Sequence, residues 1–363
     1  FMEAQNIMTD IGIMSYGIAV PYLRLPVKDT INVWKNNNVE FINQHFGILA
    51  RTVVNSDEDT LTLATDSAKM ALTNSSLKAK DIDSILLGSC STPDIFKSNA
   101  NQIMSFLSNK HTYFGCDIRS SENSGMSALA LGYSLLKSQL SKASLVIGSD
   151  TLCKNIFPSE LRESYTGAGA ASLILGTEDI LAKIVGIGNS NAAFSEQCRT
   201  EDSRFIRILA NLNTAVIQEG LVKRCVNSIN NVLSNCNLSL NDIDHFVFPE
   251  NIGNIPHILA KALHIETFED KKEFEKLGYL GSASPLISFL ITLEKAKIGD
   301  KILVCGYGHG SGSTAIIFQV IKKPDFDHNL NTYLNYYKNI DYASAMKAEF
   351  KLSQPDIALG TFI

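Results

Sequence analysis

The sequence is poor in charge and in aromatic residues, and it lacks the patterns that identify several common classes of protein. Only 19% of its 363 residues are charged, the net charge is −5, and tryptophan occurs once. A surface that binds nucleic acid needs clustered Lys and Arg, so this composition argues against a nucleic-acid partner. No apolar run is long enough to cross a bilayer, and no basic segment followed by an apolar stretch opens the chain. We therefore expect neither a nucleic-acid nor a membrane partner.

Paired cysteines are also lacking. The seven cysteines are odd in number and scattered, and no two are spaced as Cys-x-x-Cys. This pattern favours a reduced, cytoplasmic setting, and it gives no support for disulfides or for a structural metal site in this chain. We expect no cofactor bound to the chain itself.

What the sequence does contain is an internal repeat. Leu77–Cys90 and Leu238–Asn251 both carry an Asp-Ile-Asp turn followed by an apolar strand. Gly167–Leu175 and Gly310–Phe318 match in the same order further along. The period is too long for a solenoid, so the repeat indicates two copies of one α/β unit. Duplicated α/β halves place their chemistry where the strand ends of the two copies meet.

Hydrophobic periodicity predicts strands that alternate with helices, which is typical of α/β architecture with covered sheets. One helix, predicted from about 123 to 141, is rich in small residues, so we expect it to be central and closely packed. Residues 8–24 are predicted to form a strand with a turn through Gly17. The other elements predicted in the first half are a helix containing Trp34, helices over 57–73 and 97–109, and strands over 82–88, 114–121, 144–149, 171–176 and 182–188.

The predicted organisation has three parts. Residues 1–180 form an N-terminal half and residues 181–322 a C-terminal half. Residues 323–363 differ from both because they are rich in Asn and Tyr. Because this many aromatic residues would be unusual in a disordered segment, we expect a C-terminal tail that packs on the body or on a partner.

Four motifs carry a resemblance to a known family. They are Asp57-Glu-Asp-Thr-Leu-Thr-Leu-Ala64, Glu163-Ser-Tyr-Thr-Gly-Ala-Gly-Ala-Ala171, the glycine-rich Gly306–Ser313, and Ile340-Asp-Tyr-Ala343. In this order they resemble the thiolase superfamily, in its branch of ketoacyl synthase III and archaeal-type hydroxymethylglutaryl-CoA synthase. The resemblance covers essentially the whole chain. It implies the duplicated thiolase fold, with αβαβα layers in two pseudo-equivalent halves, and an assembly based on dimers.

The same resemblance implies a catalytic site whose residues are missing. The family's nucleophilic cysteine, at the start of the buried central helix, aligns with Glu122. Its histidine falls on Pro249 or Glu250, its asparagine on Tyr279, and the synthase's general-base glutamate on Cys90. A carboxylate is stabilised at a helix N-terminus but cannot form a thioester. Four such changes together indicate that the condensation chemistry has been lost.

Plainer interpretations apply to the same residues. Cys90 ends an apolar strand, where a lone cysteine is usually a small core residue. Glu122 at a helix start is more often a partner of the helix dipole than a base. His309, among the glycines beside the expected pocket, is either functional or a loop residue facing solvent. Tyr279 is expected to fill the space that the asparagine and the substrate would occupy.

Three functions remain open at this point. The chain resembles the condensing-enzyme-like subunits of three-protein C-acyltransferases, which act on phloroglucinol- or tetramic-acid-type acceptors in antibiotic biosynthesis. This resemblance implies a non-acylated structural subunit, a homodimer within a larger complex. Its expected partners are a thiolase subunit and a small zinc-ribbon/OB-fold protein, which would hold any zinc. The alternative is an active, thioester-dependent enzyme with Glu122 as base or Cys90 as nucleophile. A third function, as a small-molecule sensor, rests on the fold alone.

Overall fold

The structure is a computed structural model that describes most of the chain. The described residues are 10–35, 40–41, 47–194, 196–209, 217–250, 254–266, 268, 274–310, 312–326 and 330–352. Their α-helices are α1 (Val27–Trp34), α3 (Thr60–Thr73), α4 (Asn99–Leu107), α5 (Ser124–Lys137), α7 (Lys223–Cys236), α8 (Ile255–Ala262), α9 (Phe274–Leu277), α10 (Ser284–Lys295), α11 (Leu330–Leu334) and α12 (Tyr342–Ala348). Their strands are β1 (Gly12–Ala19), β2 (Leu23–Pro26), β3 (Ala50–Val53), β4 (Ser84–Gly88), β5 (Phe114–Ile118), β6 (Ser144–Asp150), β7 (Gly169–Gly176), β8 (Ala182–Asn191), β9 (Gln197–Cys198), β10 (Arg207–Ile208), β11 (His245–Val247), β12 (Lys301–Gly308), β13 (Gly312–Val320) and β14 (Lys338–Asn339).

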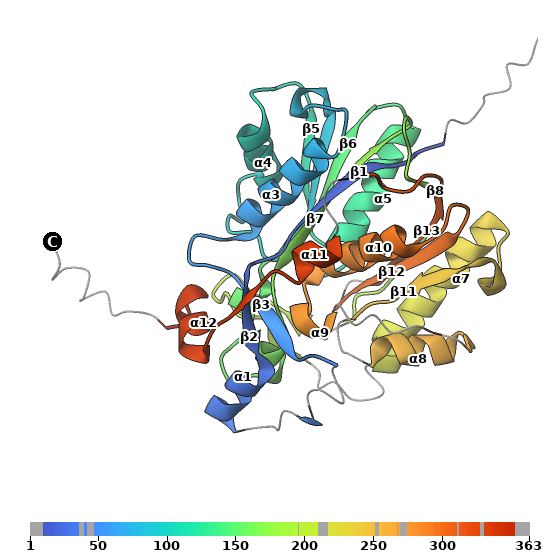
Figure 1. Ribbon diagram of the computed structural model, residues 1–363. Helices are drawn as coiled ribbons and strands as arrows, with labels where there is room; N and C mark the ends of the chain where they lie inside the picture. Colours follow the sequence, from blue (N-terminus) through green and yellow to red (C-terminus); the bar gives the residue numbers. More distant parts are fainter. Residues whose placement is uncertain are drawn as a thin grey trace, which may run out of the picture.

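Nine of these strands form one mixed sheet with two arms. The strand order is β11-β12-β13-β8-β1-β7-β6-β4-β5. The first arm, from β1 to β5, belongs to the N-terminal part of the chain, and the second, from β8 to β11, to the C-terminal part. The two arms join through only two residue pairs, Gly12↔Lys183 and Ile13↔Ala182. This narrow junction lets the arms turn toward each other, so that each covers one side of the helices between them (Figure 1).

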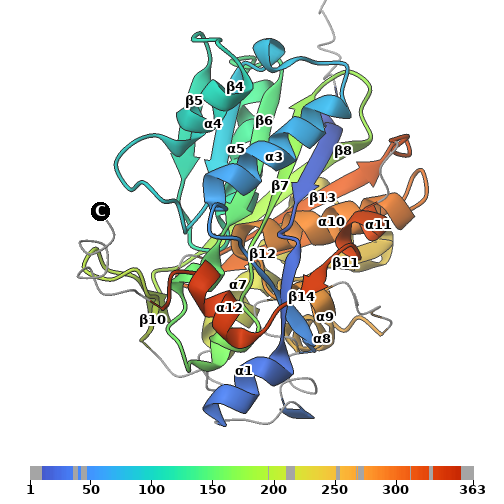
Figure 2. The ribbon, with the colours of Figure 1, turned by 60° about the vertical axis from the view of Figure 1, so that its left-hand side comes forward.

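The helices complete a layered arrangement. Helices α3 and α4 cover the outer face of the first arm and α7 that of the second, while α5 and α10 pack between the arms (Figures 1 and 2). Matching turns precede matching strands in the two halves: η1 (Ala79–Asp81) leads to β4, and η5 (Leu240–Asp242) leads to β11. The predicted duplicated thiolase-like fold is therefore confirmed. The exact boundaries at residues 180 and 322 remain predictions.

Small residues allow α5 and α10 to approach closely at the centre of the molecule. A Cβ atom on Gly125 would lie 2.2 Å from the carbonyl oxygen of Ser282, beside the start of α10. A Cβ atom on Gly88 would lie at the same distance from the oxygen of Ser124, at the start of α5. Real side chains cannot fit such contacts, so glycine is required at both positions. The prediction of a closely packed central helix is confirmed, although α5 ends at Lys137 rather than near residue 141.

One local prediction is wrong. Gly17 does not form a turn, because β1 runs straight through it from Gly12 to Ala19. A Cβ atom there would lie 2.3 Å from the carbonyl oxygen of Ser67 in α3. The glycine therefore serves close packing of a helix on a strand, a role that sequence alone does not distinguish from a turn.

The tail packs on the body. Strand β14 pairs in parallel with β2, where Lys338 lies opposite Leu23, and β2 pairs in turn with β3. Helix α12 buries Ala345 and Met346 against Leu25 and Val53. The part of the tail that the structure describes is thus an integral layer of the fold (Figure 2).

Candidate functional site

The centre of the candidate site is Glu122, which lies two residues before Ser124, the first residue of the buried helix α5. The preceding residue, Ser121, has a left-handed backbone (φ 52°), and its hydroxyl donates to Oε2 of Glu122 over 2.6 Å. The hairpin between β12 and β13 supplies His309, which contacts Glu122 directly. Its backbone N–H donates to Oε2 over 3.0 Å, and its ring Nδ1 lies 3.2 Å from Oε1. Both side chains are only 7% exposed, so this is a buried ion pair.

The pairing reverses the usual effect of burial on both groups. Burial by itself raises the pKa of Glu122, but the charge and hydrogen bond of His309, with the hydroxyl of Ser121, outweigh it and lower this pKa to about 2. Burial by itself lowers the pKa of His309, but the charge of Glu122 and its hydrogen bond raise it. Each residue therefore favours the charged form of the other, and Glu122 is a poor proton acceptor.

The cavity beside this ion pair is nearly filled. Its volume is about 20 Å³, which leaves room for about one water molecule. Its walls come from several elements: Glu122, Leu152, Ile156, Arg162, Tyr165, Thr166, Gln197, Ile206, Tyr279 and His309. Tyr279 is 6% exposed. Burial, followed by the negative charge of Glu122, raises its pKa well above the usual value, so the phenol stays protonated. The expectation that Tyr279 fills the pocket agrees with this arrangement.

A hairpin made by β9 and β10 closes one side of the cavity. Arg162 holds it: Nη1 donates to Oε1 of Gln197 over 2.5 Å, and Nη2 donates to the carbonyl oxygen of Ile206 over 2.9 Å. The same guanidinium pairs with Glu160. No sequence signal singled out Arg162, although this residue lies directly before the family-like segment that begins at Glu163.

Cys90 adjoins the site but is held as a thiol. Its Sγ donates to Oδ2 of Asp150 over 3.3 Å, and its backbone N–H donates to Oδ1 over 2.9 Å. Burial first, then the charges of Asp150 and Glu122, raise the pKa of this thiol well above the usual value. Asp150 also accepts from the backbone N–H of Ser282 over 2.8 Å. A carboxylate that disfavours the thiolate is the opposite of what a nucleophilic cysteine requires.

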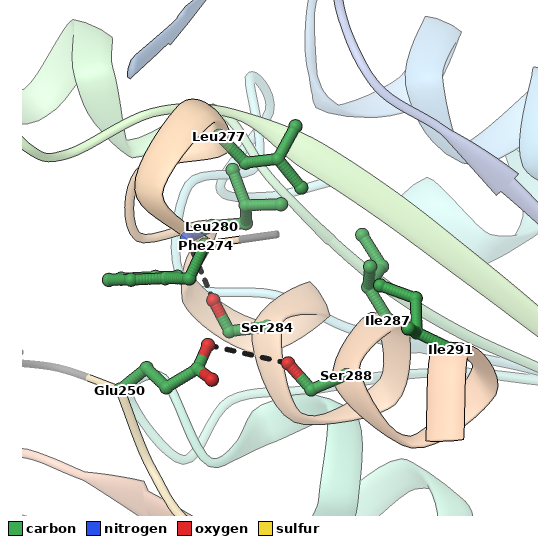
Figure 3. Close-up of a pocket in the computed structure, with 8 residues that line it drawn as sticks. All are labelled: Glu250, Phe274, Leu277, Leu280, Ser284, Ile287, Ser288 and Ile291. Atoms are coloured by element: carbon green, nitrogen blue, oxygen red, sulfur yellow. Dashed lines mark hydrogen bonds between the residues drawn. The ribbon is translucent and has the colours of Figure 1, made fainter. Parts of the chain in front are cut away.

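The residues at the end of β11 do not line this cavity. Pro249 is buried. Glu250 borders a separate, mostly apolar space of about 10 Å³ along α10, together with Phe274, Leu280, Ser288 and other residues. There its Oε2 accepts a hydrogen bond from the hydroxyl of Ser288 over 3.3 Å (Figure 3). The structure thus brings Glu122, His309, Tyr279 and Cys90 together and places Glu250 elsewhere.

The described residues contain neither a candidate metal site nor a candidate membrane-spanning helix. No group of three or more His, Cys, Asp or Glu side chains there could hold a metal ion. No helix in that part of the chain is both long and apolar enough to cross a membrane.

Comparisons with known proteins agree with this fold. The family model described as 3-oxoacyl-[acyl-carrier-protein] synthase III C terminal matches residues 233–320. The hydroxymethylglutaryl-CoA synthase of Methanopyrus kandleri is 27% identical over 315 residues, which cover 86% of this chain and 88% of that protein.

Solved structures match over most of the chain. The 3-oxoacyl-[acyl-carrier-protein] synthase III of Aquifex aeolicus has a TM-score of 0.76 at 22% identity, over 85% of this chain and 99% of that one. A hydroxymethylglutaryl-CoA synthase complexed with CoA has a TM-score of 0.79 at 18% identity, over 95% of this chain and 92% of that one.

Proposed function

We propose that this chain, which belongs to the thiolase-like superfamily of ketoacyl synthase III and hydroxymethylglutaryl-CoA synthase, is a non-acylated structural subunit of a multi-component C-acyltransferase. The superfamily contains condensing and acyl-transferring enzymes, and archaeal hydroxymethylglutaryl-CoA synthases are among the homologues of the chain. The proposed complex acylates a phloroglucinol- or tetramic-acid-type acceptor in antibiotic biosynthesis. In it, a thiolase subunit carries the reactive cysteine and a zinc-ribbon/OB-fold protein bridges the two, in the cytoplasm.

One observation carries the proposal: a carboxylate occupies the position where the family resemblance expects the nucleophile. Glu122 is locked by His309 and Ser121 at the start of α5. It cannot form a thioester, and the adjoining space of about 20 Å³ is too small for an acyl group. The rest of the fold is intact around this closed site. This is what we expect of a subunit whose role is to bind other proteins through its surface.

The geometry of the site gives little support to the alternative, an active enzyme with Glu122 as base or Cys90 as nucleophile. A carboxyl group with a pKa of about 2 is a weak general base near neutral pH. Cys90 remains a thiol, because burial and Asp150 both oppose its ionisation.

The first arm of the sheet supports the homodimer in this proposal. Strand β5 pairs with β4 alone among the described strands, so its outer edge is free for another strand. Exposed apolar side chains surround it, including Phe96 (96% exposed), Phe106 and Phe114. An unpaired edge with apolar neighbours is a typical site for strand addition, and a second copy of the chain would supply an identical, self-complementary edge. We therefore assign this surface to the homodimer.

Intact-mass spectrometry tests the proposal. The purified chain, incubated with acetyl-CoA, should gain no mass, whereas the co-expressed thiolase subunit should become acetylated under the same conditions. The three proteins should also co-purify. A mass increase of this chain that disappears in Cys90→Ala would contradict the proposal and favour an active enzyme.

A further inference from the structure

Four fully buried charges lie behind the candidate site and take no part in the function proposed above. Glu349 accepts hydrogen bonds from the guanidinium of Arg51, and the ammonium of Lys351 lies 3.0 Å from Glu349 and 3.2 Å from Glu163. All four side chains are 0% exposed. They alternate in sign and sum to zero, which is the arrangement that lets charges remain ionised away from water.

This cluster joins the end of the tail to the body. Arg51 comes from β3 and Glu163 from the short helix η3 (Leu161–Ser164), whereas Glu349 and Lys351 follow α12. The hydroxyl of Tyr342, at the start of α12, adds a hydrogen bond to Glu163 over 3.1 Å. Burial alone raises the pKa of Glu349, but the charges of Arg51 and Lys351 outweigh it and lower this pKa. Without the tail, Arg51 and Glu163 would each lose a buried partner.

The two body residues of the cluster adjoin the walls of the cavity. Glu163 is two residues before Tyr165, which lines the cavity. Arg51 packs against Gly278, where a Cβ atom would meet the Cβ of Arg51 at 2.9 Å and the oxygen of Tyr165 at 2.4 Å. Tyr279, the next residue, donates its backbone N–H to the oxygen of Tyr165 over 2.7 Å and accepts from Gly167 over 2.8 Å.

From this geometry we infer that the end of the tail is a latch, and that its release opens the cavity beside Glu122. Residues 165–167 and 278–279 pair with each other and form a strip that carries Tyr165 and Tyr279. While Glu349 and Lys351 are docked, they fix Arg51 and Glu163 beneath this strip. When they leave, Arg51 and Glu163 lose their tail partners directly behind that strip, and they keep the hydrogen bonds that Arg51 donates to the oxygen of Thr52 and that Glu163 accepts from the N–H of Ser159. Water then enters the space that the tail vacated, and Arg51, which packs against Gly278, is free to turn toward it. The strip thereby loses the support beneath it and moves. The inference depends on these contacts alone and not on the proposed complex.

Cys153 is a built-in reporter for release of the tail, and the hydrogen-bonded amide of Tyr279 is the reporter for opening of the cavity. Cys153 is 1% exposed and lies beside Leu152 of the cavity wall. Burial, followed by the charge of Glu349, raises the pKa of its thiol to about 12. Both effects weaken when the tail leaves, so alkylation of Cys153 should accelerate. Cys225, which is 0% exposed in the distant helix α7, reports global unfolding instead.

The experiment compares alkylation by iodoacetamide, read by peptide mass spectrometry, in three proteins. They are the full chain, Lys351→Met, and a chain that ends at Asn339 and so lacks α12 and both tail charges. We expect Cys153 to react about tenfold faster or more in both variants, with Cys225 unchanged. Lys322→Met, which removes an exposed charge paired with Asp179, is the matched control and should react like the full chain.

Adding the tail back completes the test. A synthetic peptide of residues 340–363 should restore the protection of Cys153 in the shortened chain, and the same peptide with Lys351→Met should not. Deuterium exchange at the amide of Tyr279 should follow the labelling. Unchanged labelling of Cys153 in both variants overturns the inference, and so does faster labelling with unchanged deuterium exchange at Tyr279, because Cys153 lies next to the tail charges and reports only their departure. A parallel rise at Cys153 and Cys225 overturns it as well, since the tail would then act only on global stability.

Discussion

Removing the charge of Glu122 tests the central ion pair most directly. The carboxyl group has a pKa of about 2 in the folded chain, against an ordinary value of 4.5. Through proton linkage this difference corresponds to about 3 kcal/mol of folding free energy. The loss of one partner from a buried pair costs about 3–5 kcal/mol in other proteins, which is consistent. We therefore expect Glu122→Gln to lower the free energy of unfolding by about 3 kcal/mol at about pH 6.

The two pKa shifts determine how the free energy of unfolding should change with pH. A lowered carboxyl pKa contributes stability that is complete above about pH 4.5 and is lost as the pH falls through about 2. The raised pKa of His309 acts in the opposite direction: its contribution is complete below about pH 6.5 and is lost as the pH rises through the folded-state pKa. The difference between wild type and Glu122→Gln should thus be largest between about pH 5 and 6.5, and should fall below half by about pH 3.

Urea unfolding at these pH values measures the effect. Glu219→Gln is the matched control, because Glu219 forms a 2.8 Å pair with Lys223 on the exposed surface, where water screens the charges and the loss of the pair should have little effect on stability. If Glu122→Gln proved as mild as this control, or its effect were the same at about pH 3 and pH 6, the ion pair would not exist in solution.

Three further predictions concern the same site and the outer edge of the sheet. Asp150→Asn should speed the alkylation of Cys90 several-fold, since it removes a charge that opposes the thiolate; an unchanged rate in peptide mass spectrometry would argue against this coupling. Glu122→Cys should remain unacylated by acetyl-CoA, because the cavity holds about one water molecule; an added acetyl mass would show that only the nucleophile is lacking. Phe114→Lys and Phe96→Ser should each shift the chain from dimer to monomer in light scattering, and a dimer that persisted in both would place the interface elsewhere.

Local signals in the sequence were sufficient for most of the secondary structure. The acidic start at Asp57–Asp59 predicted the beginning of a helix, and Asp59 indeed caps α3 by accepting from the backbone N–H groups of Leu61 and Thr62. The repeated Asp-Ile-Asp turns predicted equivalent elements that became η1 with β4, and η5 with β11. Such signals act over a few residues, so they do not depend on how the chain packs.

The contacts of the site could not be predicted in this way. Glu122 and His309 are 187 residues apart, and nothing near either residue identifies the other as its partner. His309 was left open between a functional residue and a solvent-facing loop residue, because its glycine-rich surroundings fit both. Glu250 was considered for the same pocket, yet the end of β11 places it along α10. Strand ends determine which residues can meet, but the final direction of a side chain depends on its packing.

The ion pair also explains how the fold accommodates a carboxylate at the position where the family resemblance expects a cysteine. A helix N-terminus buried at the centre of a protein favours a negative charge, because the helix dipole places partial positive charge there. Glu122 supplies that charge permanently, and His309 balances it from the opposite half of the molecule. Tyr279 occupies the space that remains. The closed site is thus a stable part of the core, and the ion pair joins the two halves of the molecule across it.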